Sequence, residues 1–441
     1  MCFPAKLHKL TILGVLYLVI GYATCSQSQD YSQIGGALTS DLPGRHALQL
    51  PAPSITNEPR RQQQLAGFTD FHSDATKRTG LGPFFVNSSC GACHIDNGKG
   101  PARFSRNGFE GSTMVVKVGV KGRNADGSIK EYPGVGSQLQ DQTINGGSRH
   151  SIRLRWQIVK GAYPDGTKYE LRKPILSFTV NGKSHRSALR SLRMTPGIIG
   201  PGLLEAIPDS VILERADLRD SNKDGISGRP NFVLDRNTST KKIGRFGFKA
   251  THPTDEQQSA AALFGDMGVT SSLFRIGTKT PEISEQNLLQ LVVYQKLAGV
   301  PRPRNQTKKE VLRGKYLFHK IGCESCHRTN MVTASTEDPE LDGQTISPFT
   351  DLLLHDMGLG LADNLPEFSA TGREWRTTPL WGLGFLRTVS RTRQLYLHDG
   401  RARSIEEAII WHGGESQKSR DRFMRMTKKD RLALVEFLKS L

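Results

Sequence analysis

The pattern Cys-x-x-Cys-His occurs twice in this chain, as CGACH at 90–94 and as CESCH at 323–327. The chain has six cysteines in all. Cys2 lies at the extreme N-terminus and Cys25 follows an apolar run, so the two motifs use the remaining four. Any fold for this chain must therefore build the same small arrangement of two thiols and an imidazole at two distant points of the sequence.

Several kinds of chemistry use closely spaced cysteines. Four cysteines of an exported protein would suit two disulfides, and a redox dithiol also uses Cys-x-x-Cys, but neither explains the histidines. Zinc could take four thiolates, one pair from each motif, and again leaves the histidines unexplained. Covalent c-type haem attachment explains every position, because two thioethers fix the porphyrin and the adjacent histidine is the proximal iron ligand. We therefore predict two covalently bound haem c groups, held by Cys90, Cys93, His94, Cys323, Cys326 and His327.

The N-terminal segment predicts export, which haem c attachment also requires. Lys6 and Lys9 precede LTILGVLYLVIGYA, an apolar run of fourteen residues that is too short to span a bilayer and fits a secretory signal. The next residues, YATC, resemble a bacterial lipoprotein box, in which Cys25 becomes the lipidated first residue. We expect a signal peptide over 1–25, a linker over 26–65, and a periplasmic protein that a lipid at Cys25 would anchor to the membrane surface.

The formal net charge is +18. The basic residues are spread along the whole chain and no nucleic-acid motif appears, so we exclude nucleic acid as a partner. In an exported protein this charge favours an acidic redox partner protein or an anionic membrane surface.

Two attachment motifs in one long chain predict two haem domains, over 66–300 and 301–441, with a boundary at the proline-rich VPRPRNQ. A weak repeat supports duplication, because Arg-x-Thr-Pro follows each motif, at Arg193 and at Arg376. Residues from about 110 to 190 alternate apolar and polar side chains between ADG, PDG and NG turns, which predicts a β-rich insertion in the first domain. Helical patterns are found in TDEQQSAAALFGDMG, SEQNLLQLVVYQKLAG, KKEVLRGKYLFHKIGC, IEEAIIWHGG and the last fifteen residues.

The motifs RTTPLWGLG, LHDGRARSIEEAI, GPGLLEAIPD, DGISGRPN, GRFGFKA and DMGVTS, together with the two CxxCH sites, resemble the bacterial di-haem cytochrome c peroxidase superfamily. The sequence is most similar to its di-haem oxidoreductase family, labelled putative peroxidase or thiol-oxidoreductase-like, from about residue 66 to 441. The resemblance implies an all-helical cytochrome core around each haem, and hence a mainly α fold. It implies an oxidoreductase, peroxidase-like, that passes electrons from a donor through one haem to a substrate at the other. The alternative is a non-catalytic di-haem electron-transfer protein.

The sixth iron ligand separates these two functions, because a saturated iron transfers electrons while an open one can bind peroxide. For the second haem the first candidate is Met357, then His355, with His398 and His412 as weaker candidates. For the first haem the candidates are Met267, and His150 or His252. Each methionine also fits simple core packing.

Peroxide cleavage needs an acid–base group beside the iron. The resemblance implies Glu205 in LLEAIPD, which follows the first Arg-x-Thr-Pro; the alternative is an ordinary exposed glutamate. Arg193 and Arg376 are candidates for contact with haem propionates. Trp375 and Trp381 are candidates for a position between the haems, although core packing would explain them too.

A calcium site is a further candidate. DSNKDGISG places Asp220, Asn222 and Asp224 at alternate positions before Gly225, as in calcium loops. Asn231 stands where an EF-hand has its glutamate, and an Asn/Asp/Gly turn would give the same pattern. The superfamily often has calcium between its domains.

Overall fold

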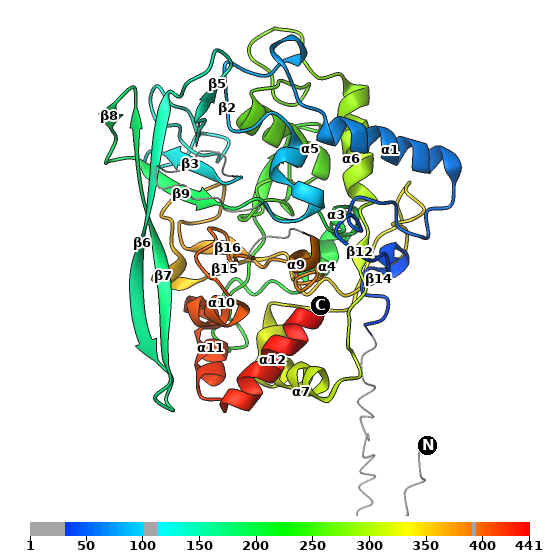
Figure 1. Ribbon diagram of the computed structural model, residues 1–441, viewed down its shortest axis with the longest axis vertical. Coiled ribbons are helices and arrows are strands. Elements are labelled where there is room, and N and C mark those ends of the chain that lie inside the picture. The colour runs from blue at the N-terminus through cyan, green and yellow to red at the C-terminus, as the bar shows by residue number, and fades with distance from the viewer. Residues whose placement is uncertain (1–30, 101–112, 390–393) are drawn as a thin grey trace, which may run out of the picture. The chain divides into compact units, whose positions relative to one another are not determined.

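The computed structural model describes residues 31–100, 113–389 and 394–441, and Tyr31–Leu441 form one compact unit (Figure 1). The predicted signal peptide and Cys25 lie outside the described residues. About 30% of the chain is helical and 20% is in strands, distributed over several small sheets. The prediction of a mainly α fold is therefore wrong. Helices surround each motif as expected, but the segments between these helices are long and form strands and irregular turns.

The helices are α1 (Glu58–His72), α2 (Cys90–Cys93), α3 (Pro201–Glu205), α4 (Asp209–Leu213), α5 (Asp255–Ala262), α6 (Glu285–Lys296), α7 (Lys309–Lys320), α8 (Gly358–Leu361), α9 (Leu386–Val389), α10 (Ile405–Trp411), α11 (Gln417–Met424) and α12 (Lys428–Ser440). All five helical patterns found in the sequence are confirmed by α5, α6, α7, α10 and α12. Among the described residues, no helix is long and apolar enough to cross a bilayer.

The strands pair in small sheets. They are β1 (Thr39–Ser40) with β12 (Val300–Pro301), β2 (Phe84–Phe85) with β5 (Gln142–Thr143), β4 (Gln138–Leu139) with β3 (Val115–Gly119) and β9 (Leu189–Arg193), β6 (His150–Ala162) with β7 (Lys168–Val180) and β8 (Lys183–Ser184), β10 (Phe232–Asp235) with β11 (Thr240–Ile243), β13 (Met331–Val332) with β14 (Thr345–Ile346), and β15 (Leu354–Asp356) with β16 (Glu374–Arg376). The strands β3 to β9 confirm the predicted β-rich segment before residue 194.

Each attachment motif follows a helix that crosses a second helix. Ahead of the first motif α1 packs on α6, and ahead of the second motif α7 packs on α12 (Figure 1). A glycine permits each close approach, because a Cβ at Gly67 would lie 2.1 Å from the carbonyl oxygen of Gln290. A Cβ at Gly314 would lie 2.0 Å from that of Ala433. Neither contact leaves room for any side chain.

A phenylalanine four residues after each of these glycines links the helix crossing to the motif. The ring centroid of Phe71 lies 5.9 Å from that of His94, and the ring centroid of Phe318 lies 6.4 Å from that of His327. Residues four apart share one face of a helix. The duplication that the Arg-x-Thr-Pro repeat predicted thus extends to the packing beneath both histidines.

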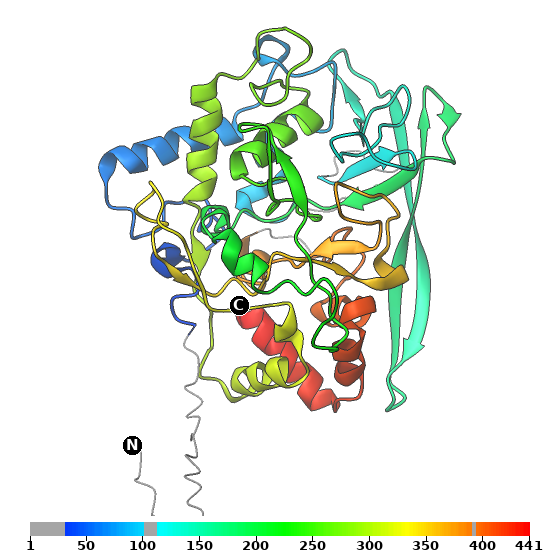
Figure 2. The same ribbon diagram turned by 180° about the vertical axis from the view of Figure 1, so that it is seen from behind.

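The first attachment motif belongs to residues 31–300, called here the first half, and the second motif to residues 301–441, the second half. The long hairpin of β6 and β7 runs along the side of the molecule (Figures 1 and 2) and joins the two halves. At its tip, Tyr163 is buried, and its hydroxyl donates to the Glu406 carboxylate at 2.6 Å. The Arg431 guanidinium lies 3.7 Å from the centre of the Tyr163 ring and 3.1 Å from a carboxylate oxygen of Asp165. The insertion in the first half is therefore anchored on α10 and α12 of the second.

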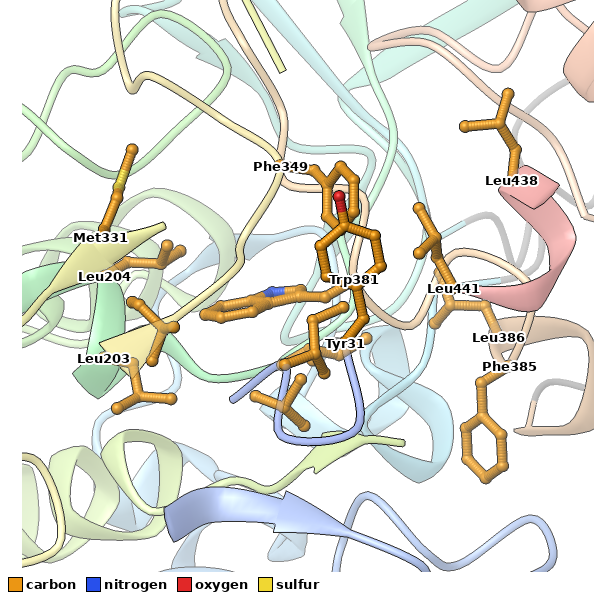
Figure 3. Close-up of a cluster of buried hydrophobic side chains, with 14 of the residues drawn as sticks. Tyr31, Leu203, Leu204, Met331, Phe349, Trp381, Phe385, Leu386, Leu438 and Leu441 are labelled. Atoms are coloured by element: carbon orange, nitrogen blue, oxygen red, sulfur yellow. The ribbon is translucent and has the colours of Figure 1, made fainter. Parts of the chain in front are cut away.

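Residues 31–57 were expected to belong to a linker, but they pack into the core. Tyr31, Ile34 and Leu38 are buried, and β1 pairs in parallel with β12. Figure 3 shows Tyr31 and Trp381 in one buried cluster that also holds Leu203 of the first half and Leu441 of the second. The two halves share this core, because each contributes apolar side chains that the other covers.

Candidate haem sites

Both Cys-x-x-Cys-His motifs line one cavity of about 740 Å³. Walls come from both halves, including α5 and β3 of the first and β16 and α10 of the second. Cavities that hold cofactors are typically about 300–1,000 Å³ and mostly apolar with a few placed polar groups. A single connected space with two attachment motifs is suited to two large planar groups lying near one another.

The four motif cysteines are free thiols, not disulfides. Burial raises the pKa of Cys90, Cys93 and Cys323 to about 12, and raises the pKa of Cys326. Reactive redox cysteines have lowered pKa values instead. Within the described part of the chain, the two pairs do not gather into a four-thiolate cluster, which speaks against the zinc alternative.

The two motif histidines are held in the same way. The Nδ1–H of His94 donates to the carbonyl oxygen of Pro196 at 2.9 Å, and the Nδ1–H of His327 donates to that of Phe349 at 2.9 Å. Burial lowers the pKa of each imidazole to about 4. Both rings are therefore neutral with Nε2 free, which is the state and orientation that an iron ligand needs.

Two cations that line the cavity, Arg376 and Lys99, have no carboxylate partner among the described residues. Burial lowers the pKa of Arg376 to about 10 and that of Lys99 to about 8. Arg376 donates only to the carbonyl oxygens of Gly247 and Thr377, and Lys99 donates to that of Leu395. Buried cations are normally paired, so these two fit the propionates of bound haem. Taken with the thiols and the histidines, the residues present fit two haem c groups.

The polar groups beside the second motif are paired with one another. His355 lies between two carboxylates, with Asp351 2.9 Å from Nε2 and Glu415 2.6 Å from Nδ1. Although burial opposes its charged form, Asp351 raises the pKa of His355 well above its ordinary value. Cys326, Asp351 and His355 are the one group in the described residues that could hold a metal ion. A charged imidazole with both nitrogens bound is not free to serve as the sixth iron ligand.

Two candidates near the second motif keep a free donor atom. Met357 lines the cavity, and its sulfur lies 3.9 Å from the Ser416 hydroxyl. His412 also lines the cavity; its Nδ1–H donates to the carbonyl oxygen of Ala408 at 2.7 Å, which leaves Nε2 free as in His327. His398 instead stacks on Trp375, with ring centroids 3.5 Å apart and planes 10° apart, so it is placed as a packing residue.

A second hollow of about 720 Å³ lies between the hairpin tip and α11. Met357 and Arg420 line both this hollow and the large cavity. Arg425 and Trp411 also line it. The hollow and the cavity that contains the second motif thus share the side chains of Met357 and Arg420.

Near the first motif, Met267 is buried among Phe71, Leu263 and other apolar side chains and lines the cavity. His252 lines the cavity as well, whereas His150 does not: its Nδ1 lies 2.6 Å from the carbonyl oxygen of Gln140. Of the three candidates for the first haem, Met267 and His252 are therefore placed at the cavity.

Several buried polar atoms at the cavity wall of the first half have no hydrogen-bond partner. They are Nδ1 of His252, Oδ2 of Asp255 and Oε1 of Gln258. Burial lowers the pKa of His252 to about 3, and burial together with Glu205 raises the pKa of Asp255 to about 8. Unsatisfied buried groups are costly and rare. A neutral imidazole and a carboxyl that keeps its proton at neutral pH are here available to a molecule in the cavity.

Glu205 is not among the cavity-lining residues. One carboxylate oxygen lies 2.7 Å from the Lys296 ammonium, and the other accepts from the backbone N–H of Asp255 at 2.6 Å. Glu205 therefore sits behind Asp255 and helps to raise its pKa. The sequence indicated this neighbourhood but not the residue that faces the cavity.

The predicted arginines and tryptophans are brought to the cavity wall. Trp381, Arg376 and Trp375 line it, and so does Arg193, which forms ion pairs with Asp363 and Glu367. The Lys249 ammonium, fully buried, lies 2.8 Å from Asp363 and 4.6 Å from the centre of the Trp375 ring. Sequence reasoning missed Lys249, because only the tertiary structure surrounds it with acceptors.

The predicted calcium loop closes on itself. Asn222 Nδ2 donates to Asp224 at 3.1 Å, the backbone N–H of Gly225 donates to Asp220 at 3.0 Å, and the Lys418 ammonium donates to the carbonyl oxygen of Asp224 at 2.5 Å. The side chains share one turn, with their oxygens used by N–H donors.

Sequence reasoning also missed Asp255, Gln258 and Lys117. Asp255 and Gln258 lay within a helix that the capping pattern identified, and a helical wheel would have placed both near one face. No sequence signal distinguishes a cavity-facing carboxyl from an exposed one, because partners come from other segments.

The cavity, the two fixed imidazoles and the paired thiols define a protein that binds two haem groups. The chain belongs to the family described as "Di-haem oxidoreductase, putative peroxidase", whose model matches residues 131–278 and 275–441. The resemblance found in the sequence is thereby confirmed.

Among solved structures, the chain is similar to hydrazine synthase of Kuenenia stuttgartiensis, pressurized with xenon, at 13% sequence identity. The match covers 99% of this chain and 100% of that chain, with a TM-score of 0.38. No curated protein sequence matches the chain.

Proposed function

We propose that this protein is an exported di-haem c-type oxidoreductase that reduces a peroxide-type substrate at the first haem, with electrons entering through the second. Family membership supports the cofactor and the reaction class. The basic, apolar N-terminus supports export. His94 and His327 would be the proximal ligands, and the four motif thiols would form the thioethers. When bound, each haem would supply an iron that exchanges single electrons, and an open sixth position would coordinate the substrate.

The observation that carries this proposal is the difference between the polar groups of the two halves. His252, Asp255 and Gln258 have unpartnered atoms at the cavity wall of the first half. Next to the second motif, His355 and its carboxylates satisfy one another. Free donors and acceptors suit a site where a substrate exchanges protons, and a closed network suits a site that only passes electrons.

Reduction of hydrogen peroxide to two waters consumes two electrons and two protons. Asp255 keeps its proton up to about pH 8 and is our candidate proton donor. His252, neutral because its pKa is about 3, is the candidate acceptor that moves a proton from one peroxide oxygen to the other. Glu205, implied by the family resemblance, would act through Asp255 as a positioning residue.

For the second haem we retain Met357 as the proposed sixth ligand, with His412 as its competitor. A thioether ligand gives the oxidised protein a weak charge-transfer band at long visible wavelengths, and a second imidazole does not. Loss of that band in Met357→Ala would support Met357. Its persistence in that variant, or its absence from the wild type, would transfer the role to His412. For the first haem, Met267 is the proposed sixth ligand of a closed, inactive state.

The electron donor is proposed to be an acidic redox protein that docks over the hollow beside α11. Arg420, Arg422 and Arg425 give this helix and its end a positive surface, and Met357 forms the wall shared with the haem cavity. Opposite charges steer such encounters and make them sensitive to salt. Arg425→Glu should slow donor oxidation at low ionic strength, and Arg60→Glu on the distant α1 is the control.

Calcium binding by Asp220, Asn222 and Asp224 remains a proposal, supported by the ligand spacing and tested by the effect of a chelator on thermal stability. A lipid on Cys25 also remains a proposal, to be tested by the intact mass of the mature protein.

The test of function is hydrogen peroxide turnover by purified holoprotein with a reduced small cytochrome as donor, measured both fully oxidised and half-reduced. We expect turnover, and a loss of about 10²–10⁴-fold in kcat for Asp255→Asn. Asp209→Asn is the matched control, since Asp209 is a half-exposed carboxylate bound by Arg245. No turnover in either state, with both haems still exchanging electrons, would leave the non-catalytic relay.

A further inference from the structure

Lys117 points from the centre of a small sheet into the haem cavity. It lies in β3, between β4 and β9, and it lines the cavity together with the first motif. Burial lowers the pKa of its ammonium. The Asp266 carboxylate, which raises the pKa of Cys90 and Cys93 by its charge, also acts on Lys117. Lys117 and the first attachment motif therefore share one part of the cavity.

No carboxylate of a described residue lies within 4.0 Å of the Lys117 ammonium, the distance that defines an ion pair. The two carboxylates that act on it from further away are already bound. Asp266 accepts from Gln138 at 2.5 Å, and burial raises its pKa, which favours its neutral form. Glu367 is ion-paired with Arg193. The Lys117 charge thus has no counter-ion in the described structure.

His252 adds a second unpartnered group at this place. Both residues line the cavity, and after burial itself Lys117 has the largest effect on the pKa of the His252 imidazole, whose Nδ1 atom is buried with no partner among the described residues. Arg236, which also lines the cavity, contributes further positive charge. A buried cation beside a free imidazole attracts an anion strongly, because the cavity has a lower dielectric than water.

We propose that Lys117 and His252 form an anion-binding subsite on the first-haem side of the cavity, which holds the substrate as a small anion such as hydroperoxide or another small oxyanion. The inference rests on the proposed function, since it names the charge of the substrate used there. Lys99 and Arg376 are the candidates for contact with haem propionates, and the test below distinguishes an anion subsite at Lys117 from a propionate contact.

The test is an equilibrium titration of the oxidised holoprotein, without electron donor, with azide as the anionic probe and imidazole as the neutral one. For Lys117→Gln we expect azide affinity to fall about tenfold or more, as loss of a charged hydrogen bond implies. Imidazole affinity should change by no more than about twofold. Lys117→Arg should retain azide binding, and Lys160→Gln, at a lysine whose side chain is 80% exposed on β6, is the control.

Unchanged azide affinity in Lys117→Gln would overturn the proposal, and so would a wild type that binds no azide. A shift of haem potential without a change in azide affinity would make Lys117 a propionate partner instead. Haem content and Soret spectrum verify folding, and Lys117→Arg keeps the test valid if Lys117→Gln does not fold. Because no turnover is measured, the subsite can hold where peroxidase activity fails, and the reverse outcome is equally visible.

Discussion

The two halves of this molecule build the same support for a haem and surround it with different polar groups. In each half a glycine lets two helices touch, and a phenylalanine packs on the motif histidine. In the first half, His252 and Asp255 each have a buried atom without a hydrogen-bond partner, and Lys117 lines the same cavity with no ion pair to a described residue. In the second, Asp351, His355 and Glu415 close on one another. The comparison teaches that the same helix packing occurs in both halves while the buried polar groups differ, and under the proposed function this difference would give each half its own task.

The largest effect should come from removing one pair of motif thiols, which should separate electron acceptance from peroxide turnover. Cys90→Ala/Cys93→Ala and Cys323→Ala/Cys326→Ala should each retain one haem, as measured from haem per protein. The first variant should accept electrons from the donor but lose peroxide turnover. The second should bind azide but lose reduction by the donor. If the two variants behaved alike, the halves would not be specialised.

Asp255→Asn should weaken a loss of stability with rising pH to which Asp255 contributes in the first half and His355 in the second. The pKa of Asp255 is raised from 3.8 to about 8 by burial and Glu205. Its contribution to the free energy of unfolding is therefore fully present below about pH 4 and is lost as the pH rises through about 8. Glu415 has the opposite sign. Although burial opposes its charge, the hydrogen bond from His355 lowers the pKa of Glu415. The stability that the charged carboxylate contributes is lost as the pH falls through this lowered pKa.

Thermal unfolding of holoprotein between pH 6 and pH 9 measures this difference. The wild type should lose stability over that range, and Asp255→Asn should lose less. Glu415→Gln should instead reduce stability at neutral pH and leave the contribution of Asp255 to the alkaline slope unchanged. If Asp255→Asn lost as much stability between pH 6 and pH 9 as the wild type, Asp255 would not be a source of the pH dependence.

The matched glycines test whether the scaffold is equivalent in both halves. Gly67→Ala and Gly314→Ala should each destabilise the protein by about 1–3 kcal/mol, because the added Cβ would overlap a backbone carbonyl of the facing helix. Chemical unfolding of the holoprotein measures both, with Leu312→Ala, at a residue 51% exposed on α7, as the control. A large difference between the two glycine variants would show unequal packing.

The smallest effect should come from the contact that ties the halves together. Tyr163→Phe removes the hydroxyl that donates to Glu406, and should cost about 1 kcal/mol. Tyr163→Ala also removes the ring beneath Arg431 and should cost more, whereas Ile158→Ala, 48% exposed on the same hairpin, should cost little. Equal effects of Tyr163→Phe and Ile158→Ala would mean that the tip is not anchored through this hydroxyl.

Local signals predicted local structure. The capping residues Thr254 and Ser404 begin α5 and α10 as expected, because a cap depends only on a few neighbouring residues. The mainly α fold, which the family resemblance implied, was wrong because helical cores around the two motifs do not measure how much chain lies between the helices. Asp255 lines the cavity and Glu205 does not. The sequence could not show this, because the partner of Glu205 is Lys296, which is distant in the chain.

The sequence alone determined that the chain carries two haem attachment motifs, since spacing and residue type suffice for that chemistry. It also identified the family and most helices near the motifs. Only the tertiary structure decided that both motifs face one cavity, that His355 is enclosed by carboxylates, and that His252 and Asp255 keep buried atoms without a hydrogen-bond partner among the described residues. The reason is physical. Attachment depends on atoms a few residues apart, whereas burial and pairing depend on segments that meet only when the chain folds.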